Sequence, residues 1–425
     1  MIIVTLKLGR IIDRTILVLT MVVICSFTIL TTYTWGRYVM LMCLLAIFVL
    51  DSARKDFKFR MNTGSHFIWL SAWIVFTLAS AVWAENPADS VEKAKTMLEM
   101  LIMVCILFHA YSERENSAED FLFVIKWSSY IIVVYTITFY GVDYLKKVAA
   151  SAGKLELENA FANVNTIAML AAVGTLIEAD EFLDKRKIKL SIIFAVLSVI
   201  LLALTMSRKA FVMLLLGVVM LLLLRNFEEK DALNKIFKTI LGILICAVAI
   251  YALVQLPIFS GTMKRMQRMI AGFTGIGRVD NSTTVRMTMM EIGLEQFKKT
   301  PLLGMGIGNP HNLVIAKMGK DAYLHNNFIE LLAGGGIIGF LLFYSVYVYF
   351  FKNYCKYRKR KNPKYYICFT IMVIFLLMDY GRVSYYSKVS YIFFLLSFLE
   401  INRLKTDERK HKQIEQREEG GAGWA

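Results

Sequence analysis

The sequence is poor in charged residues and in cysteines that could cross-link or bind a metal. Only 19% of the 425 residues are Asp, Glu, Lys or Arg, whereas 57% are hydrophobic. Soluble globular domains have about 25% charged residues, so this composition excludes an ordinary soluble protein. The cysteines lack metal-ligand spacing and all but one lie inside apolar runs, so we expect neither disulfides nor bound zinc. They are Cys25, Cys43, Cys105, Cys246, Cys355 and Cys368.

Long apolar runs fill most of the chain. A run of about 18 apolar residues can cross a bilayer, and a helix satisfies its own backbone hydrogen bonds there. We therefore predict an all-α, polytopic membrane protein with about twelve transmembrane helices. The first run leads straight into a second without a small-residue cleavage pattern, so we expect no cleavable signal peptide. The expected spans are 15–33, 38–50, 66–84, 96–111, 120–141, 161–179, 189–206, 210–225, 237–257, 326–350, 364–380 and 385–401.

The positive charge predicts the orientation of these spans. The net charge is +16, and about 29 of the 49 Lys and Arg residues lie on one side if the N-terminus is cytoplasmic. The segment "YCKYRKRKNPK", residues 354–364, is the strongest marker of that side. We therefore interpret the basic residues as a topology signal rather than as a nucleic-acid site, and expect both termini in the cytoplasm.

These spans divide the chain into four parts. Residues 1–257 would hold helices 1–9, residues 258–325 one large outer loop, and residues 326–401 helices 10–12. Residues 402–425 are charged and then glycine-rich, which predicts a mobile cytoplasmic tail. Within the outer loop, "STTVRMTMMEIGLEQFKK" (282–299) predicts an amphipathic helix at the membrane surface or on the bundle.

Three polar features fall on the predicted outer face. Arg208 and Lys209 interrupt two apolar spans, Arg286 lies on the amphipathic helix, and His325 precedes the tenth span. Arginine suits phosphate because its planar fork donates two hydrogen bonds, and histidine exchanges protons near neutral pH. Each feature alone also fits a structural role, as a snorkelling pair, a solvated position or an interfacial histidine.

Other polar residues at this face rank lower. Asn326 could cap the tenth span, and Asn163 and Asn165 could cap the sixth or contact a sugar. Arg382, among tyrosines, could stack on a sugar or anchor the interface. We rank His311 as a loop residue. The glycines at 334, 335, 336 and 339 predict a kink or a close backbone approach that would fix the helix carrying His325.

The spacing of these residues resembles a known family. His325 and Asn326, then nine residues, Gly336, two residues and Gly339 resemble the signature H-[N/S/Q]-x9-G-x-x-G of the O-antigen ligase and O-antigen polymerase superfamily. "SRKA" (207–210) resembles its first arginine motif. "VRMTMMEIGLEQFKKTPLLGMGIGN" (285–309) resembles its outer-loop helix, which begins with an arginine and ends at P-L-x-G-x-G.

The resemblance implies a lipid-linked glycosyltransferase of the helical C-type architecture in the bacterial inner membrane. Such enzymes take a glycan from undecaprenyl diphosphate on the outer face and give it to a glycan or lipid-glycan acceptor. We expect Arg208 and Arg286 to bind the diphosphate and His325 to act as general base, with inversion at the anomeric carbon. Lys209 and Asn326 would support them, and Asn163, Asn165 and Arg382 are further candidates for substrate binding.

No cofactor or metal is expected, because the outer segments have no D-x-D pair to hold a divalent ion on a pyrophosphate. The partners would be the lipid-linked donor, the acceptor and membrane lipids, with a chain-length regulator as a further candidate. We favour a polymerase of repeat units, since no outer loop is obviously built to receive a large lipid A core. The alternatives are an O-antigen ligase and a polysaccharide transporter or flippase. Apart from Lys126 and Glu99, the span centres are nearly free of charge, which disfavours the transporter.

Overall fold

The computed structural model describes most of the chain, and its regular structure is helical throughout the described part. The described residues are 2–31, 33–57, 64–150, 163–185, 190–226, isolated positions between 231 and 255, 260–274, 281–358 and 364–421. The predicted span 237–257 lies largely outside them.

Helices cover the other eleven predicted spans. They are α1 (Ile2–Ile29), α2 (Thr34–Arg54), α3 (Ser65–Ala79), the 3-10 turn η1 (Ser80–Val82), α4 (Pro87–Tyr111), α5 (Ser117–Tyr140), α7 (Val164–Lys185), α8 (Ile192–Thr205), α9 (Arg208–Asn226), α14 (Asn327–Tyr357), α15 (Tyr365–Met378) and α16 (Lys388–Gly421). Seven segments in the described part are long and apolar enough to cross a membrane, while α8 and α15 are apolar but shorter. The described part of the chain is thus helical in its regular structure and has the apolar helices of a multi-pass membrane protein, and twelve spans remain a prediction.

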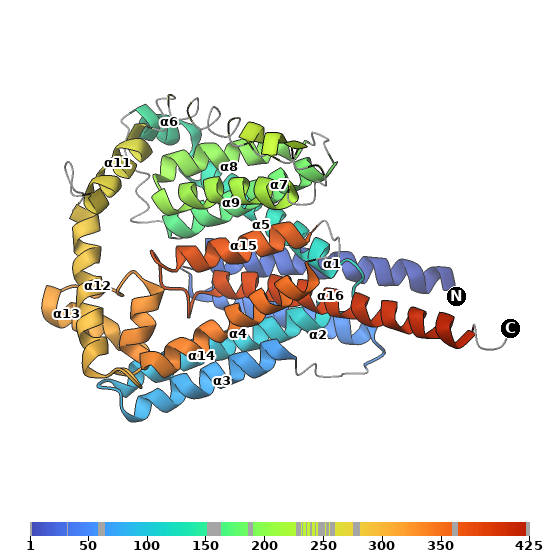
Figure 1. Cartoon of the computed structure of the whole chain (residues 1–425), viewed down its shortest axis with the longest axis horizontal. Coiled ribbons are helices and arrows are strands. Elements are labelled where there is room, and N and C mark those ends of the chain that lie inside the picture. Colours follow the sequence, from blue (N-terminus) through green and yellow to red (C-terminus); the bar gives the residue numbers. More distant parts are fainter. Residues whose placement is uncertain are drawn as a thin grey trace.

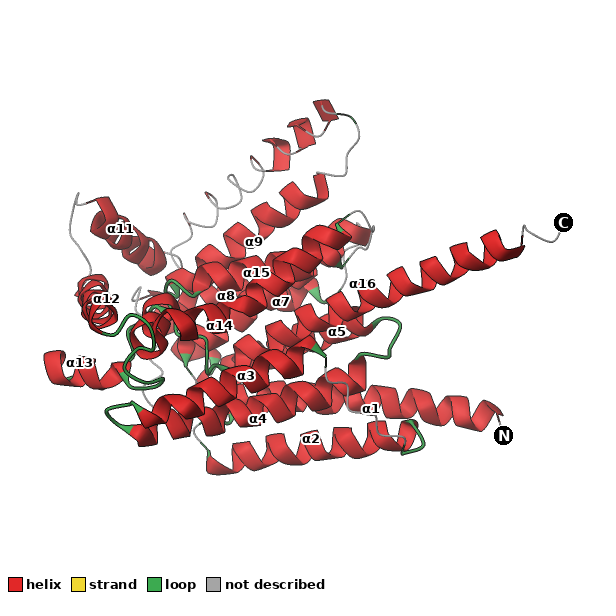
Figure 2. Cartoon of the chain, turned by 60° about the horizontal axis from the view of Figure 1, so that its bottom comes forward, coloured by secondary structure: helices red, strands yellow, loops and turns green. Residues whose placement is uncertain are grey.

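Four further helices are α6 (Val142–Ala150), α11 (Ser260–Thr274), α12 (Asn281–Lys299) and α13 (Pro310–Met318). Figure 1 shows α11 and α12 running across one end of the bundle, while both chain termini emerge at the opposite end. We call these the site end and the terminal end. Figure 2 gives the same arrangement, with α11, α12 and α13 grouped together and the termini far from them.

The predicted amphipathic helix 282–299 is α12, which begins one residue earlier. Met289 and Ile292, from one of its two apolar rows, are buried. Met289 packs in a small cluster with Leu324, which lies just before α14, and with Ala333 of α14. Leu294, from the other row, is 41% exposed, so the first row supplies the buried contacts named here between α12 and the bundle.

The predicted mobile tail begins at residue 402. In the structure, α16 continues beyond residue 401 as far as Gly421, so this part of the tail is helical. Ion pairs one turn apart support this extension, such as Arg403 Nη1 to Asp407 Oδ2 at 3.3 Å. Glu408 also accepts a hydrogen bond from the Tyr357 hydroxyl at 2.8 Å, which joins the extension to the end of α14. The low hydrophobicity of these residues concealed the helix.

The helix that follows His325, α14, is broken at Gly336. Gly336 has φ 60° and ψ −163°, which interrupts the helix. The freed carbonyls of Ala333 and Gly334 accept hydrogen bonds from Met305 N and Gly306 N, both at 2.9 Å. A Cβ at Gly336 would lie 2.3 Å from the Leu302 carbonyl oxygen. Glycine is therefore required there, both for the backbone angle and for the close approach of the 301–306 loop.

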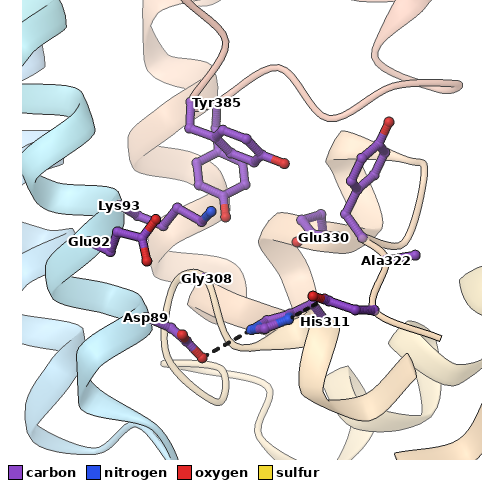
Figure 3. A pocket seen from close by; sticks show the side chains of 11 residues that line it. Asp89, Glu92, Lys93, Gly308, His311, Ala322, Glu330 and Tyr385 are labelled. Atoms are coloured by element: carbon purple, nitrogen blue, oxygen red, sulfur yellow. Dashed lines mark hydrogen bonds and ion pairs between the residues drawn. The ribbon is translucent and has the colours of Figure 1, made fainter. Parts of the chain in front are cut away.

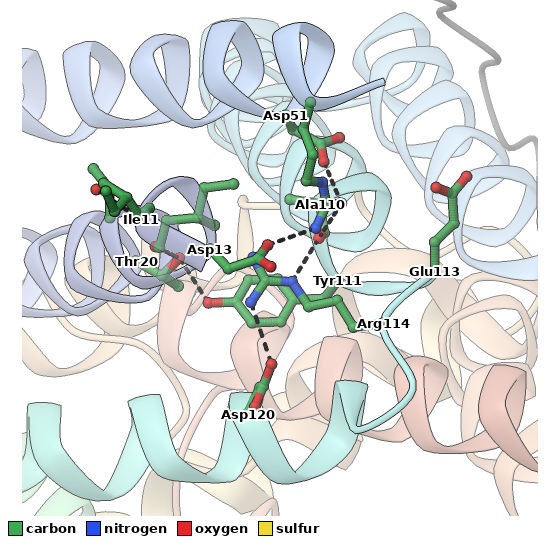
Figure 4. A network of polar contacts seen from close by, with 12 residues as sticks. Ile11, Asp13, Thr20, Asp51, Ala110, Tyr111, Glu113, Arg114 and Asp120 are labelled. Carbon is green, nitrogen blue, oxygen red and sulfur yellow. Dashed lines mark hydrogen bonds and ion pairs between the residues drawn. The ribbon is translucent and has the colours of Figure 1, made fainter. Parts of the chain in front are cut away.

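The terminal end is held by a network of ion pairs (Figure 4). Asp51 is 2% exposed and lies 2.6 Å from Arg54 and 3.1 Å from Lys55. Arg54 also reaches Asp13 of α1 at 2.7 Å, and Arg114 reaches Asp120 at 3.2 Å. Each cation named here has a carboxylate beside it, so the network ties α1, α2, α4 and α5 together without excess charge.

Candidate functional site

The tight turn between α8 and α9 places Arg208 and Lys209 at the site end. Met206 ends α8 in the left-handed region with φ 48°, and α9 starts at Arg208 two residues later. Arg208 is 8% exposed, and its Nη1 donates to Thr283 Oγ1 of α12 at 3.5 Å. The start of α9 therefore lies against the start of α12.

Lys209 lies among other cations. The charges that act on it most strongly are the guanidinium groups of Arg286, Arg382 and Arg208. Its side chain packs on Gly381, where a Cβ would lie 3.0 Å from the Lys209 Cε. Three separate stretches, α9, α12 and the 379–387 turn, thus bring positive charge to one place. We call Arg208, Lys209, Arg286 and Arg382 the cation cluster.

His325 adjoins this cluster in a strained conformation. Its φ is 58°, unusual for a residue with a side chain, and such strain is concentrated at functional sites. Burial, together with the positive charges of Arg286 and Lys209, lowers the pKa of His325 to about 4. The imidazole is therefore neutral at neutral pH. Its Nδ1 is buried and has no hydrogen-bond partner among the residues that the structure describes, so this nitrogen can accept a proton from a ligand.

The comparison with protein families bears on this same stretch. Residues 193–344 match the family model described as O-antigen ligase. The resemblance to the O-antigen ligase and polymerase superfamily is confirmed. The matched segment contains His325 and, of the cation cluster, Arg208, Lys209 and Arg286 but not Arg382. No curated protein matches the chain.

Asn326, which lies in the segment that matches the family model, caps a helix. Its side-chain oxygen accepts from Ile329 N at 3.1 Å and so caps α14, as its place in the sequence suggested. Its Nδ2 contacts Met290 Sδ at 3.4 Å, which links the cap to α12. The side chain is 2% exposed and holds the turn that presents His325.

Asn327 is a residue that sequence reasoning did not single out. It is fully buried, and its side-chain oxygen accepts from Ser384 N at 2.8 Å and Tyr385 N at 3.2 Å. Its Nδ2 donates to the Tyr344 hydroxyl at 2.8 Å. Asn327 therefore fastens the 379–387 turn, and with it Arg382, to the start of α14. Nothing in the sequence distinguishes it from a second cap residue.

The remaining predicted residues lie around the cation cluster. Asn163 caps α7 by accepting from Asn165 N at 2.9 Å, and Asn165 accepts from the Ser207 hydroxyl at 3.1 Å, next to Arg208. Arg382 stacks on the Phe375 ring at 5.0 Å and donates to Ser390. Asn163 is thus a cap, Asn165 contacts the neighbour of Arg208 in the sequence, and Arg382 belongs to the cation cluster.

His311, ranked as a loop residue, holds a more specific position. Its Nε2 lies 3.0 Å from Asp89 Oδ2 on α4, and its Nδ1 lies 2.9 Å from Asp321 Oδ1. Burial would lower the pKa of His311, but hydrogen bonds with Asp321 and Asp89 outweigh this and raise it. Asp89 and His311 are 222 residues apart in the sequence, so no local pattern could have joined them.

Proposed function

We propose that the protein is a glycosyltransferase that polymerises undecaprenyl-diphosphate-linked repeat units without a metal. The observation that carries this proposal is the cation cluster beside a neutral, buried imidazole within an O-antigen ligase segment. Like charges held close together repel one another, so a bound anion of two phosphates gains attraction from several cations at once. Such preorganised charge stabilises a developing phosphate leaving group by several kcal/mol when water is excluded.

In the proposed reaction, a hydroxyl of the acceptor attacks the anomeric carbon of the donor glycan. The new C–O bond forms as the bond from that carbon to the diphosphate oxygen breaks, with inversion, and undecaprenyl diphosphate leaves with the electron pair. Arg208, Lys209 and Arg286 offset its charge. His325 accepts the hydroxyl proton, and the unpartnered Nδ1 is the nitrogen that the geometry favours.

The site end would face the exterior of the bacterial inner membrane, with membrane lipids around the spans and a chain-length regulator as a possible further partner. This orientation can be tested by labelling single cysteines. A membrane-impermeant thiol reagent should label a Glu291→Cys protein, in a background without native cysteines, in intact cells. It should label a Glu113→Cys protein at the terminal end only after lysis, and the opposite pattern would refute the orientation.

An O-antigen ligase is the second candidate, because the matching family model carries that description. The purified protein should be incubated with its lipid-linked repeat unit alone. A ladder of products on a gel supports the polymerase, whereas product formation only after a lipid A core is added supports the ligase. No product with either acceptor, from protein that is folded and inserted, would contradict the transferase proposal.

A further inference from the structure

A second polar pocket lies next to the proposed reaction centre, on the α4 side. It has a volume of about 310 Å³, which is at the lower end of the range for small-molecule sites. Figure 3 shows side chains from α4, the 308–323 segment, α14 and the turn before α16 around it. The lining residues are Asp89, Glu92, Lys93, Gly308, His311, Asp321, Ala322, Tyr323, Glu330, Tyr385 and Tyr386. We call this the tyrosine–carboxylate pocket.

Contacts among these residues hold the walls in place. His311 bridges Asp89 and Asp321, as described above, and Asn312 Nδ2 donates to Asp89 Oδ2 at 3.0 Å. The Lys93 ammonium lies 4.4 Å from the centre of the Tyr386 ring. The pocket is therefore built from side chains in fixed positions, which lowers the entropic cost of binding a ligand.

Glu330 brings a buried carboxylate to the wall of this pocket. The residue is 3% exposed, and its Oε2 accepts a hydrogen bond from Leu324 N at 2.8 Å. That bond closes the turn on which His325 lies, one residue after Leu324. A ligand that contacts Glu330 would therefore sit against the same turn that presents the imidazole.

Tyr323 connects the pocket to His325. It lines the pocket, and the centre of its ring lies 4.3 Å from the centre of the His325 ring. Arg286 acts electrostatically on both Tyr323 and His325, which places the cation cluster beside the same pair. A group held in the pocket is thus separated from the proposed diphosphate site by little more than these two rings.

The lining chemistry favours a sugar. Carboxylates accept hydrogen bonds from hydroxyl groups, and tyrosine rings offer flat apolar faces with a polar edge. The carboxyl groups that line the pocket outnumber its basic side chains by four to two, so a phosphate or a uronic acid is disfavoured. A metal ion is also disfavoured, because no three His, Cys, Asp or Glu residues in the described part of the chain converge as ligands.

We infer that the tyrosine–carboxylate pocket binds the terminal sugar of the acceptor glycan, a neutral or amino sugar, and directs one of its hydroxyls toward His325. This inference rests on the proposed function for the role of the sugar as acceptor. It adds a site, its lining residues and the chemical class of its ligand.

Binding without turnover gives the first test. The probe is the phosphate-free oligosaccharide released by mild acid from the repeat-unit lipid of the cell that makes this protein, titrated into the protein in nanodiscs. We expect Tyr386→Ala to weaken binding about tenfold and Glu92→Gln about threefold, since each removes one contact to the sugar. Glu92 is exposed, so its amide variant should fold normally. Glu291→Gln, the same change at an exposed position of α12 outside the pocket, should bind like the wild type.

Turnover separates the acceptor from the donor. With lipid-linked acceptor varied at fixed donor, Glu92→Gln and Glu330→Gln should raise the acceptor KM more than the donor KM, whereas Arg286→Ala should reduce kcat. A larger effect on the donor KM would assign the pocket to the donor sugar and overturn the inference. Wild-type binding and acceptor KM in all three pocket variants would also overturn it while leaving the proposed function intact. Conversely, pocket-dependent binding with no product from any lipid-linked donor would refute the proposed function and leave the sugar site standing.

Discussion

The two ends of the bundle differ in the charges that surround their basic side chains. At the terminal end, Arg54 lies 2.6 Å from Asp51 and 2.7 Å from Asp13, and Lys55 lies 3.1 Å from Asp51. At the site end, the charges that act most on Lys209 are three guanidinium groups. The first arrangement neutralises itself, whereas the second gathers charge of one sign.

The difference separates folding from function. A neutralised network stabilises the fold and offers little to a ligand, since its charges are already satisfied. A cluster of like charges costs free energy in the unliganded protein, and a bound anion recovers that cost. Charge removal should therefore affect stability at the terminal end and activity at the site end, and each prediction below tests part of this contrast.

The largest expected effect is on turnover. Arg286→Ala should lower kcat about 10²- to 10³-fold, the range found when one donor to a developing anion is removed. The thermal midpoint should stay unchanged or rise slightly, because one source of repulsion on Lys209 is lost. Lys298→Ala, on the same helix in its last turn, serves as the control for loss of a surface cation. Equal activity in the two variants would show that the charge of Arg286 matters no more for turnover than that of a surface cation.

The converse substitution is Asp51→Ala at the terminal end. The carboxylate is 2% exposed and lies against three basic side chains, so its loss should destabilise the protein by about 3 kcal/mol. Activity per folded molecule should not change. Glu113, which pairs with Lys55 at 3.2 Å but is 65% exposed, is the matched control, and Glu113→Ala should cost less than about 1 kcal/mol. Comparable losses from both changes, in denaturant unfolding, would contradict the structural role of the buried network.

The positions of the helices could be predicted from the sequence because the length and composition of each apolar run are enough to indicate a helix that crosses the membrane. Arg208, Arg286 and His325 were also within reach, because spacing and residue type identify them singly. The tyrosine–carboxylate pocket was not, since it depends on contacts such as Asp89 with His311 that arise only when α4 packs on the 308–323 segment. The helical tail was missed for a related reason: Glu408 gains its support from Tyr357 and Lys356 on another helix.

A third prediction concerns how the break in α14 helps the site end to keep its shape. Gly336→Ala should destabilise the protein by about 2–3 kcal/mol and also reduce turnover, because the new Cβ would strike the Leu302 carbonyl and shift the turn carrying His325. Gly319→Ala is the matched control: its φ is 64°, but nothing lies within 4 Å of the added Cβ. It should cost only about 1 kcal/mol of backbone strain and spare turnover. Thermal unfolding and product ladders of both variants would show whether the clash or the strain matters.

The pH dependence of turnover should reveal the cations around His325. Its pKa lies near 4 instead of 6.5, so the imidazole stays deprotonated as the pH falls through the usual histidine range. We expect kcat/KM, which reports the free enzyme, to stay level from pH 7.5 down to about 5. An acid limb with a midpoint near 6.5 that is absent from the residual activity of His325→Ala would mean that neither burial nor the cation cluster lowers the pKa of this base.

The smallest expected effect is the pH dependence of the tyrosine–carboxylate pocket. His311 of α13 faces Asp89 and Lys93 of α4 and Asp321 of the segment between α13 and α14, and its pKa is raised above 6.5. A raised pKa means that the folded protein holds the proton more tightly than the unfolded chain. The stabilisation is thus complete below pH 6.5 and is lost as the pH rises through the folded pKa.

Because Asp321 is 78% exposed, the gain should be at most about 1 kcal/mol. Amide hydrogen exchange of residues 308–323 should accelerate on the alkaline side of that pKa in the wild type, after correction for intrinsic rates. His311→Gln should show no such step, since an amide keeps hydrogen bonding without a titratable charge. A step of equal size in both proteins would mean that the pocket wall is held by packing alone, and the contrast between the two ends would then reside entirely in the cation cluster.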